Sequence, residues 1–383
     1  MTKLLTGLLI LAAASSTWAL PTMVRLGYPN CVSCHVSPQG GGLLNEYGRG
    51  IDEAQSLRAG EYVGKVPESL SLLTLNGRLD QDVRVLITEG VSRLPGAQFA
   101  IAFRSRFYYR TSTNLAKPLR LTVTAAGENE PSPRRSFAYD PAIVPGQAFV
   151  PLALLQYRPK EGIELAVGRD QLPMGVYTGD LATLVRARNR FGYYDTPLQA
   201  KLFLWGKRWQ AVPYVFAPSG RGGDQVREKG GGVLGEYDLF GKGRTIVGVN
   251  LLRGTDRLEN RLMASVHTRL GFGQWGILAE HAFTRRELLS TNAQATFGQR
   301  TSYVQAFRAF REWLVGSLIF ERVSVPVPFE ERVLLARTEL SARLSPNFTT
   351  AVRMGMQYDQ RTGRAGPTAT FILAWKTVAL RPW

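Results

Sequence analysis

The sequence predicts an all-β fold, a transmembrane antiparallel β-barrel of about 16 strands with a short N-terminal plug. Three observations predict it. Apolar and polar residues alternate with period 2 from about residue 72 to the C-terminus. Short and long connections alternate along the same region, and the one long apolar run lies at the N-terminus. We expect residues 1–19 to be a leader, 20–70 the plug and 71–383 the barrel.

Residues 1–19 have the pattern of a secretory signal peptide. Lys3 supplies the positive charge, an apolar run extends from Leu4 to Ala14, and cleavage is expected after Ala19. The run is shorter than the roughly 18 residues that a spanning helix needs, and no later segment supplies one. Any membrane association of the mature chain is therefore expected to depend on strands.

The strand pattern also assigns faces. Residues 73–87, 99–110 and 334–344 each place apolar side chains opposite charged or polar ones. In residues 119–124 the apolar set is Leu119, Leu121 and Val123, and the polar set is Arg120, Thr122 and Thr124. Many long strands with arginines opposite an apolar face suit a barrel with a polar lumen. A secreted array of β-sandwiches, in which the apolar faces pack together, is the alternative.

The connection lengths support the barrel. Tight connections fall near residues 160–162, 206–207, 241–243, 271–273, 312 and 345–347, and longer ones near 128–147, 171–196, 219–230, 287–299, 324–330 and 359–366. Bacterial barrels alternate short periplasmic turns with longer outer loops in this way. Treating residues 180–194 as part of one long outer loop keeps the alternation and places both barrel ends in the periplasm. The last run ends on Trp383, an aromatic residue common at the end of a closing strand.

Cys31 and Cys34, the two cysteines of the chain, are followed directly by His35. The spacing C-x-x-C-H is that of c-type haem attachment, in which two thiols bind the haem vinyl groups and the imidazole ligates the iron. A disulfide between the same thiols is the alternative, but no thioredoxin-like pattern surrounds them. The sequence therefore predicts one covalent haem c.

A haem site in residues 20–70 needs help from the barrel. About 50 glycine-rich residues are too few to bury a haem alone. A barrel of about sixteen strands encloses a space wide enough for an aqueous channel. We expect the N-terminal segment to fold into the lumen, or to lie at its periplasmic side, as a haem-bearing plug.

The chain resembles the fused cytochrome-porins of bacterial outer membranes. The likeness lies in Cys31–His35, in the stretch Leu44, Asn45, Glu46, Tyr47, Gly48, Arg49, and in the order leader, haem segment, barrel. The resemblance implies a monohaem cytochrome joined to a barrel of about sixteen strands. The best-known members oxidise ferrous iron outside the cell, so it also implies a possible extracellular Fe(II) oxidase.

Strand parity selects candidates for the sixth iron ligand. His267 shares the luminal face with Arg261, Met263, Ser265 and Arg269 and is the candidate that a plugged haem could reach. An ordinary hydrogen-bonded lumen histidine is the interpretation that we favour. His281, Met354 and Met356 are expected to face outward, and Met23 and Met174 lie outside clear strands and stay open.

The net charge of +17 bears on partners. Luminal arginines are expected at Arg78, Arg84, Arg104, Arg106, Arg110 and Arg120. They would balance haem propionates, disfavour free cations in the lumen and admit small anions, so Fe²⁺ is expected to react at the outer mouth. Alternatively they line a solvated wall with Asp80, Asp82 and Glu339 as counter-charges. Nucleic acid is not expected as a partner.

These expectations combine into an electron conduit of the bacterial outer membrane. Its single haem would pass electrons between an extracellular metal or anionic redox substrate and a periplasmic carrier such as a soluble cytochrome. Two alternatives remain: an anion-preferring porin whose haem plug is structural or senses redox state, and a haem enzyme acting on a small anion. The enzyme needs a distal acid or base, and the N-terminal segment has no second histidine for that role.

Overall fold

The computed structural model describes thirteen stretches of the chain: residues 21–28, 30–39, 44–58, 79–92, 100–128, 148–176, 183–192, 195–218, 228–257, 259–289, 295–326, 330–346 and 348–376. The expected leader (1–19), the run 72–78 with Arg78, and the terminal Trp383 lie outside them. The side chains of Asp80, Asp82, Arg84, Arg104 and Arg106 also lie outside the described set.

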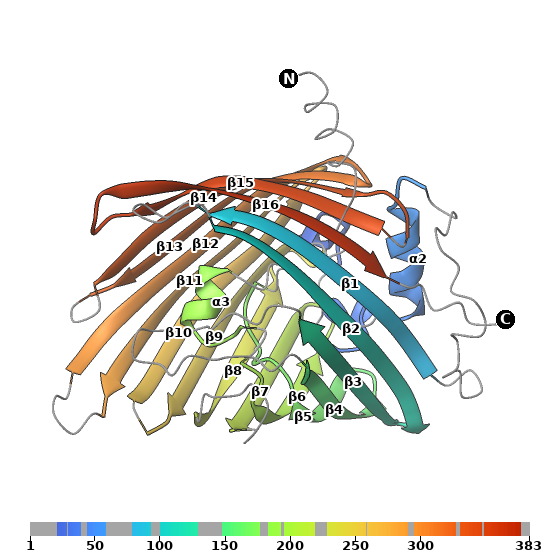
Figure 1. Cartoon of the computed structure of the whole chain (residues 1–383). Coiled ribbons are helices and arrows are strands. Elements are labelled where there is room, and N and C mark those ends of the chain that lie inside the picture. Colours follow the sequence, from blue (N-terminus) through green and yellow to red (C-terminus); the bar gives the residue numbers. More distant parts are fainter. Residues whose placement is uncertain are drawn as a thin grey trace.

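The described residues form sixteen antiparallel strands in one closed barrel. Each strand pairs with its neighbours in sequence, and β1 pairs with β16 to close the ring (Figure 1). The strands are β1 Leu79–Ser92, β2 Ala100–Ala116, β3 Leu119–Glu128, β4 Ala148–Lys160, β5 Ile163–Arg169, β6 Leu198–Trp205, β7 Trp209–Ala217, β8 Lys229–Asp238, β9 Thr245–Thr255, β10 Glu259–Phe272, β11 Trp275–Leu288, β12 Ala295–Arg311, β13 Leu314–Val325, β14 Glu331–Arg343, β15 Phe348–Asp359 and β16 Arg364–Lys376. The predicted fold class and strand number are confirmed.

Short helices make up the rest of the described secondary structure. Two 3-10 helices, η1 (Pro21–Leu26) and η2 (Cys31–Ser33), and the helix α2 (Glu46–Ala54) belong to the N-terminal segment. The helix α3 (Leu184–Arg188) lies between β5 and β6 in sequence. Within the described residues, no helix is both long and apolar enough to cross a membrane.

The two ends of the barrel differ in their connections. The turns β2–β3, β4–β5, β6–β7, β8–β9, β10–β11, β12–β13 and β14–β15 have two to six residues and lie at one end, which we call the short-turn end. The other connections lie at the long-loop end and reach 28 residues, between β5 and β6. The predicted parity is confirmed, although the β9–β10, β13–β14 and β15–β16 connections at this end have only three to five residues.

Strand β10 shows how the two faces differ. Arg261 and Met263 are each 1% exposed and His267 is 4% exposed, whereas Leu262 is 56% and Val266 is 58% exposed. The alternation places polar residues in the lumen and apolar residues on the outer wall. An alternating apolar outer wall is what a strand facing lipid requires, because hydrocarbon cannot solvate charged groups.

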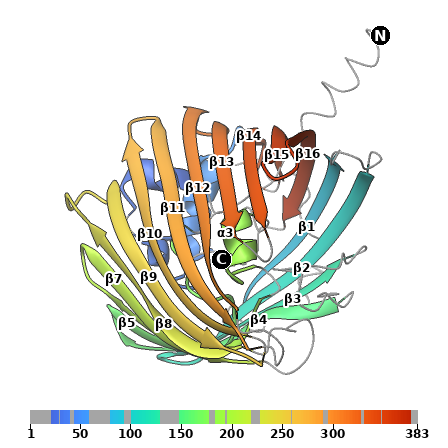
Figure 2. The ribbon, with the colours of Figure 1, turned by 90° about the vertical axis from the view of Figure 1, so that its left-hand side faces the viewer.

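One expectation about the loops needs correction. The β5–β6 connection, expected to be an outer loop, starts and ends at the long-loop end but folds into the lumen, where α3 lies against β12 and β13 (Figure 2). We call the described residues of this connection, 170–176, 183–192 and 195–197, the inward loop. Arg190 of this loop pairs with the buried carboxylates of Asp256 and Glu259, and these ion pairs stabilise the inward position.

Candidate functional site

The N-terminal segment lies across the short-turn end of the lumen. Its first turn, η1, packs on β10 and β11. Gly27 has φ +86°, and a Cβ there would lie 2.8 Å from the carbonyl oxygen of Lys242 in the β8–β9 turn. Arg25, 6% exposed, forms an ion pair with Glu312 in the β12–β13 turn. Glycine is required where the segment meets the turn so closely.

The later part of the segment is tied to the β14–β15 turn. The amide of Leu57 donates to the carbonyl of Arg343 at 2.8 Å, and the amide of Arg58 donates to that of Leu344 at 3.1 Å. The Arg343 guanidinium also pairs with the Asp52 carboxylate at 2.8 Å. Since the β8–β9 and β14–β15 turns are far apart around the ring, the segment spans the mouth of the barrel.

Cys31, Cys34 and His35 form one tight turn. The amides of Cys34 and His35 both donate to the carbonyl of Cys31, at 3.2 and 2.9 Å. Side chains three positions apart in a 3-10 turn lie one above the other, so Cys31 and Cys34 share a face. Both thiols are free and partly buried. Two thiols and one imidazole on a single turn are the donor set that covalent haem attachment uses, so these residues fit the predicted group.

Asn45 holds this turn in place. Its amide donates to the carbonyl of Cys34 at 2.9 Å. Its side-chain Nδ2 donates to the carbonyls of Val32 and Ser33, at 3.2 and 3.1 Å. One asparagine therefore satisfies three consecutive carbonyls of the cysteine turn, which would otherwise need water.

Gly48 completes the contact. A Cβ at Gly48 would lie 2.1 Å from the carbonyl oxygen of Cys34, so only glycine fits. A β-bridge between His35 and Leu44 closes the other side of the turn. We call residues 44–48 the clasp. They belong to the stretch on which the resemblance depends, and their geometry gives it a physical role: they clamp the backbone that carries both thiols and the imidazole.

Cys31 lies beside charged residues of the barrel wall. Its thiol is within hydrogen-bonding reach of Arg269 and near Glu236. Burial raises the pKa of Cys31 to about 11, while the Arg269 charge lowers it in part. The raised pKa lowers the thiolate fraction of Cys31, and the thiolate is the form that reacts in disulfide exchange.

His267 lies in the lumen, as predicted, but both of its nitrogens face protein. Nε2 lies 2.9 Å from Oε1 of Glu236, whose Oε2 accepts from Arg269 at 2.6 Å. A Cβ at Gly175 would lie 2.5 Å from Nδ1, and one at Gly248 would lie 2.3 Å from Cε1. His267 is a hydrogen-bonded lumen histidine packed between two glycines. Iron ligation by His267 would require this packing or the Glu236 hydrogen bond to break.

The other ligand candidates separate into two groups. His281, Met354 and Met356 are exposed on the outer face, which confirms the parity prediction. Met174 is 5% exposed in the inward loop, where its sulfur accepts from Nε of Arg186 at 2.8 Å. Met23 is partly buried in η1. The described residues contain no group of three or more His, Cys, Asp or Glu side chains placed to hold a metal.

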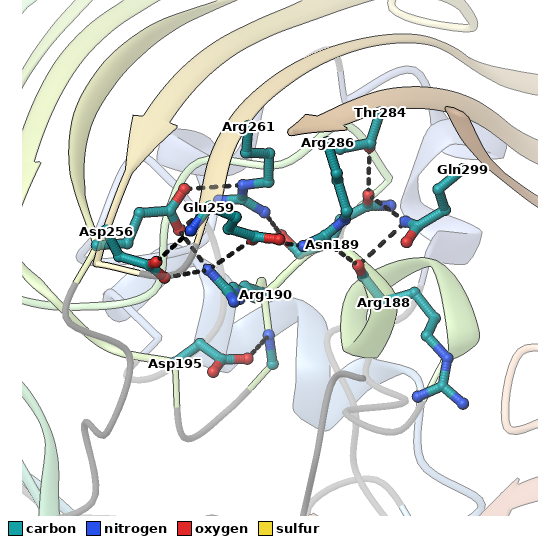
Figure 3. A network of polar contacts seen from close by, with 12 residues as sticks. Arg188, Asn189, Arg190, Asp195, Asp256, Glu259, Arg261, Thr284, Arg286 and Gln299 are labelled. Carbon is teal, nitrogen blue, oxygen red and sulfur yellow. Dashed lines mark hydrogen bonds and ion pairs between the residues drawn. The ribbon is translucent and has the colours of Figure 1, made fainter. Parts of the chain in front are cut away.

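A buried charge network fixes the inward loop (Figure 3). Arg190 lies 3.1 Å from Asp256, 3.0 Å from Glu259 and 3.6 Å from Glu228. Two wall arginines share these acids: Arg261 binds Glu228 at 2.8 Å, and Arg286 binds Glu259 at 2.6 Å. Buried charges are stable only when each is paired and hydrogen-bonded, and removal of one partner is strongly destabilising.

Asn189 adds neutral hydrogen bonds to this network (Figure 3). Its Nδ2 donates to Thr301 at 2.9 Å, and its Oδ1 accepts from Thr284 at 2.7 Å and from Gln299 at 3.0 Å. Wall strands β11 and β12 supply these three partners. No periodic pattern in the sequence indicates this network, because its members lie in separate loops and strands.

The plug and the inward loop touch each other. Gln39 donates to the carbonyls of Gln171 and Leu172, at 3.1 and 3.3 Å. The fully buried Lys201 on β6 binds both Gln39 and Asp170. Gln39 and the buried Lys201 therefore hold the two luminal segments together.

Of three comparisons with known proteins, the one with solved structures finds matches. No protein-family model and no curated protein sequence matches the chain. OprB of Pseudomonas putida matches with TM-score 0.58 and 9% identity, over 81% of this chain and 96% of that one. OmpT of Vibrio cholerae, folded in vitro, matches with TM-score 0.57 and 8% identity, over 80% and 99%. The anion-selective porin from Comamonas acidovorans matches with TM-score 0.54 and 9% identity, over 78% and 100%. The chain has the β-barrel fold of outer-membrane porins.

Proposed function

We propose that this protein is an electron conduit of the bacterial outer membrane, with one haem c attached at Cys31 and Cys34 and ligated by His35. The observation that carries the proposal is that both thiols and the imidazole lie on one turn. This turn belongs to the N-terminal segment, which spans the barrel mouth. The chain's own fold supports the membrane location: a closed barrel with a polar lumen and an apolar outer wall belongs in lipid. The resemblance to fused cytochrome-porins points to the same assignment.

The residues around the turn have separable roles. Cys31 and Cys34 hold the cofactor, His35 supplies the proximal nitrogen, and Asn45 and Gly48 keep the turn closed. When bound, the haem would supply reversible one-electron transfer. The barrel wall excludes lipid from the site, and the inward loop narrows the path from the long-loop end.

The thickness of the membrane indicates that the protein needs electron-transfer partners on both sides. A single haem does not span an apolar band of about 25 Å. We therefore infer an extracellular donor or acceptor at the long-loop end, either Fe(II) or an anionic redox substrate, and a periplasmic carrier such as a soluble cytochrome at the short-turn end. Whether the protein acts as an extracellular Fe(II) oxidase depends on the direction of electron flow, which the test must determine.

The haem is tested first. The protein is expressed in a bacterial host that matures c-type cytochromes, purified in detergent and assayed by pyridine haemochrome spectroscopy and intact mass. One covalent haem per chain is expected, with none in the double variant Cys31→Ala, Cys34→Ala. Full-length barrel protein that matures without haem would overturn the assignment.

An anion-preferring porin with a structural or redox-sensing haem plug is the second candidate. Solved porins share the fold, and one of them is described as anion-selective. Planar-bilayer recording separates the candidates. Large anion conductance that is insensitive to reduction favours a porin with a structural plug, and conductance gated by reduction favours a redox sensor. The conduit account expects little conductance in either redox state, because the plug and the inward loop both occupy the lumen.

A further inference from the structure

The short-turn end of the barrel is strongly basic in its described residues. Seven cationic side chains on or beside the turns are exposed: Lys117, Lys160, Lys207, Arg208, Lys242, Arg244 and Arg311. Two acidic side chains are exposed there, Glu161 and Glu312, and Glu312 already pairs with Arg25. Asp238 in the same region is 2% exposed and is capped by the amide of Gly243 at 2.6 Å. Among the residues that the structure describes, the exposed charge at this end is therefore predominantly positive.

The plug adds exposed apolar surface at the same end of the barrel. Leu26 is 39%, Tyr47 53% and Leu57 48% exposed, and all three belong to the segment that spans the mouth. Figure 1 shows α2, which carries Tyr47, at the end of the barrel where β16 finishes. Apolar side chains surrounded by charged ones are the usual anatomy of a protein-docking surface. We call these three residues and the seven cations the mouth surface.

The position of the apolar residues favours a protein over lipid. The mouth is encircled by the strand ends, whereas lipid lies outside the barrel, against its apolar outer wall. Leu57 and Leu26 belong to the plug, whose backbone is bonded to the β14–β15 turn at one side and packed on β10 and β11 at the other. A partner must approach this surface along the barrel axis, from the compartment that the short turns face.

We propose that the mouth surface docks an acidic soluble redox protein, and that complementary charge brings it to the face where Cys31 and Cys34 lie. The inference rests on the proposed function, because it identifies the chemistry of the periplasmic partner. Opposite charges accelerate encounter and fix orientation, and the effect falls with ionic strength. In the step itself one electron leaves the reduced protein and reduces the ferric iron of the docked partner, or passes in reverse.

The test uses two probes that differ in charge and share a fold: a basic soluble cytochrome c, and the same cytochrome after succinylation of its lysines. The whole protein is placed in nanodiscs of neutral phosphatidylcholine. Binding is measured by microscale thermophoresis, and electron transfer by stopped-flow absorbance, over a range of ionic strengths. We expect the succinylated probe to react about tenfold faster or more at low salt, with the advantage lost at high salt.

Two charge-reversal variants locate the effect. Lys117, Lys160, Lys207 and Lys242 are replaced by Glu at the short-turn end, and Lys229, Arg257, Arg332 and Arg361, all exposed at the long-loop end, are replaced by Glu as the matched control. The first variant should reverse the preference for the succinylated probe, and the control should keep it. Equal effects of the two variants would show that overall charge, not a docking surface, is responsible, and would overturn the proposal.

Remaining outcomes separate this inference from the proposed function. Charge-dependent binding of the succinylated probe at the short-turn end without electron transfer would keep the docking surface and contradict the conduit. Electron transfer with no dependence on probe charge or on the short-turn lysines would keep the conduit and overturn the docking surface. An effect of the lysine variant confined to nanodiscs that contain phosphatidylglycerol would assign these cations to lipid headgroups and overturn the docking surface too.

Discussion

Nε2 of His267 lies 2.9 Å from Oε1 of Glu236, and Oε2 of the same carboxylate lies 2.6 Å from the guanidinium of Arg269, which reaches the Cys31 thiol. The chain His267, Glu236, Arg269 therefore connects the haem-binding turn to the barrel wall. Its other end packs against Gly175 of the inward loop, where a Cβ would lie 2.5 Å from Nδ1 of His267. His267 therefore contacts both the Glu236–Arg269 pair beside Cys31 and Gly175 of the inward loop.

The charges beside Cys31 should set the reduction potential. Glu236→Gln leaves Arg269 without its carboxylate, so the local field becomes more positive and the reduced state is stabilised. We expect the midpoint potential to rise by about 40 mV, equivalent to ~1 kcal/mol for one electron. Arg269→Gln should lower it by a similar amount. Spectroelectrochemical titration measures both, with the exposed Glu161→Gln as control. Unchanged potentials in both variants would contradict the proximity of these charges to the haem.

His267 is expected not to be an iron ligand. His267→Gln keeps a side chain that can hydrogen-bond to Glu236, so the ferric spectrum and spin state should stay as in the unmodified protein. His281→Gln, on the outer face, is the matched control. Conversion of the His267 variant alone to a high-spin spectrum, seen by absorbance or electron paramagnetic resonance, would make His267 the sixth ligand.

Gly48 should be essential for the clasp. Gly48→Ala places a Cβ against the carbonyl oxygen of Cys34, where an ideal Cβ lies only 2.1 Å away, and we expect a cost of about 2 kcal/mol to the folded plug. The N-terminal segment should become sensitive to protease and its haem content should fall. The barrel should still show its heat-modifiable migration in electrophoresis.

Gly50→Ala is the control for that substitution, because no atom lies within 4 Å of its ideal Cβ. Gly50 belongs to α2, where alanine stabilises a helix by about 1 kcal/mol relative to glycine. Protease resistance and haem content should therefore be retained or improved. Equal damage from the two alanines would refute the close contact between Gly48 and Cys34.

The inward loop should depend on its buried ion pairs. Arg261→Met leaves Glu228 with Arg190 alone, at 3.6 Å, so we expect a cost of about 3–5 kcal/mol to the docked loop. Released from the wall, the loop should be cleaved by added protease, and bilayer conductance should increase. Arg253→Met, an exposed position on the neighbouring strand, is the control. Conductance that stays equal in both variants would show that the loop does not narrow the lumen.

The barrel was predictable because strand parity is a local signal. A strand residue lies on the same face as the residues two positions away. This pattern predicts that His267 faces the lumen and His281 faces outward, and the structure confirms both. The cysteine turn was recognisable for the same reason: its three functional residues lie within five positions.

The inward loop and the partners of His267 were not predictable. Arg190 pairs with Glu259, 69 positions away, and His267 with Glu236, 31 positions away on β8. Such contacts depend on how the ring closes and where a 28-residue connection folds, neither of which leaves a periodic trace. The contact of Gly48 with Cys34 was not predictable either. The resemblance identified the stretch that contains Gly48 but not what this glycine contacts.

Electron transfer across a sealed membrane tests the central claim most directly. The protein is reconstituted into liposomes that contain a sealed redox dye, and Fe(II) is added only outside while stopped-flow absorbance follows the haem and the dye. The conduit account predicts reduction of the haem followed by reduction of the dye, with neither in liposomes that contain the double variant Cys31→Ala, Cys34→Ala. A second experiment places a reductant inside the liposomes and an oxidant outside. If no electrons cross the membrane through the haem in either experiment, the conduit account is contradicted.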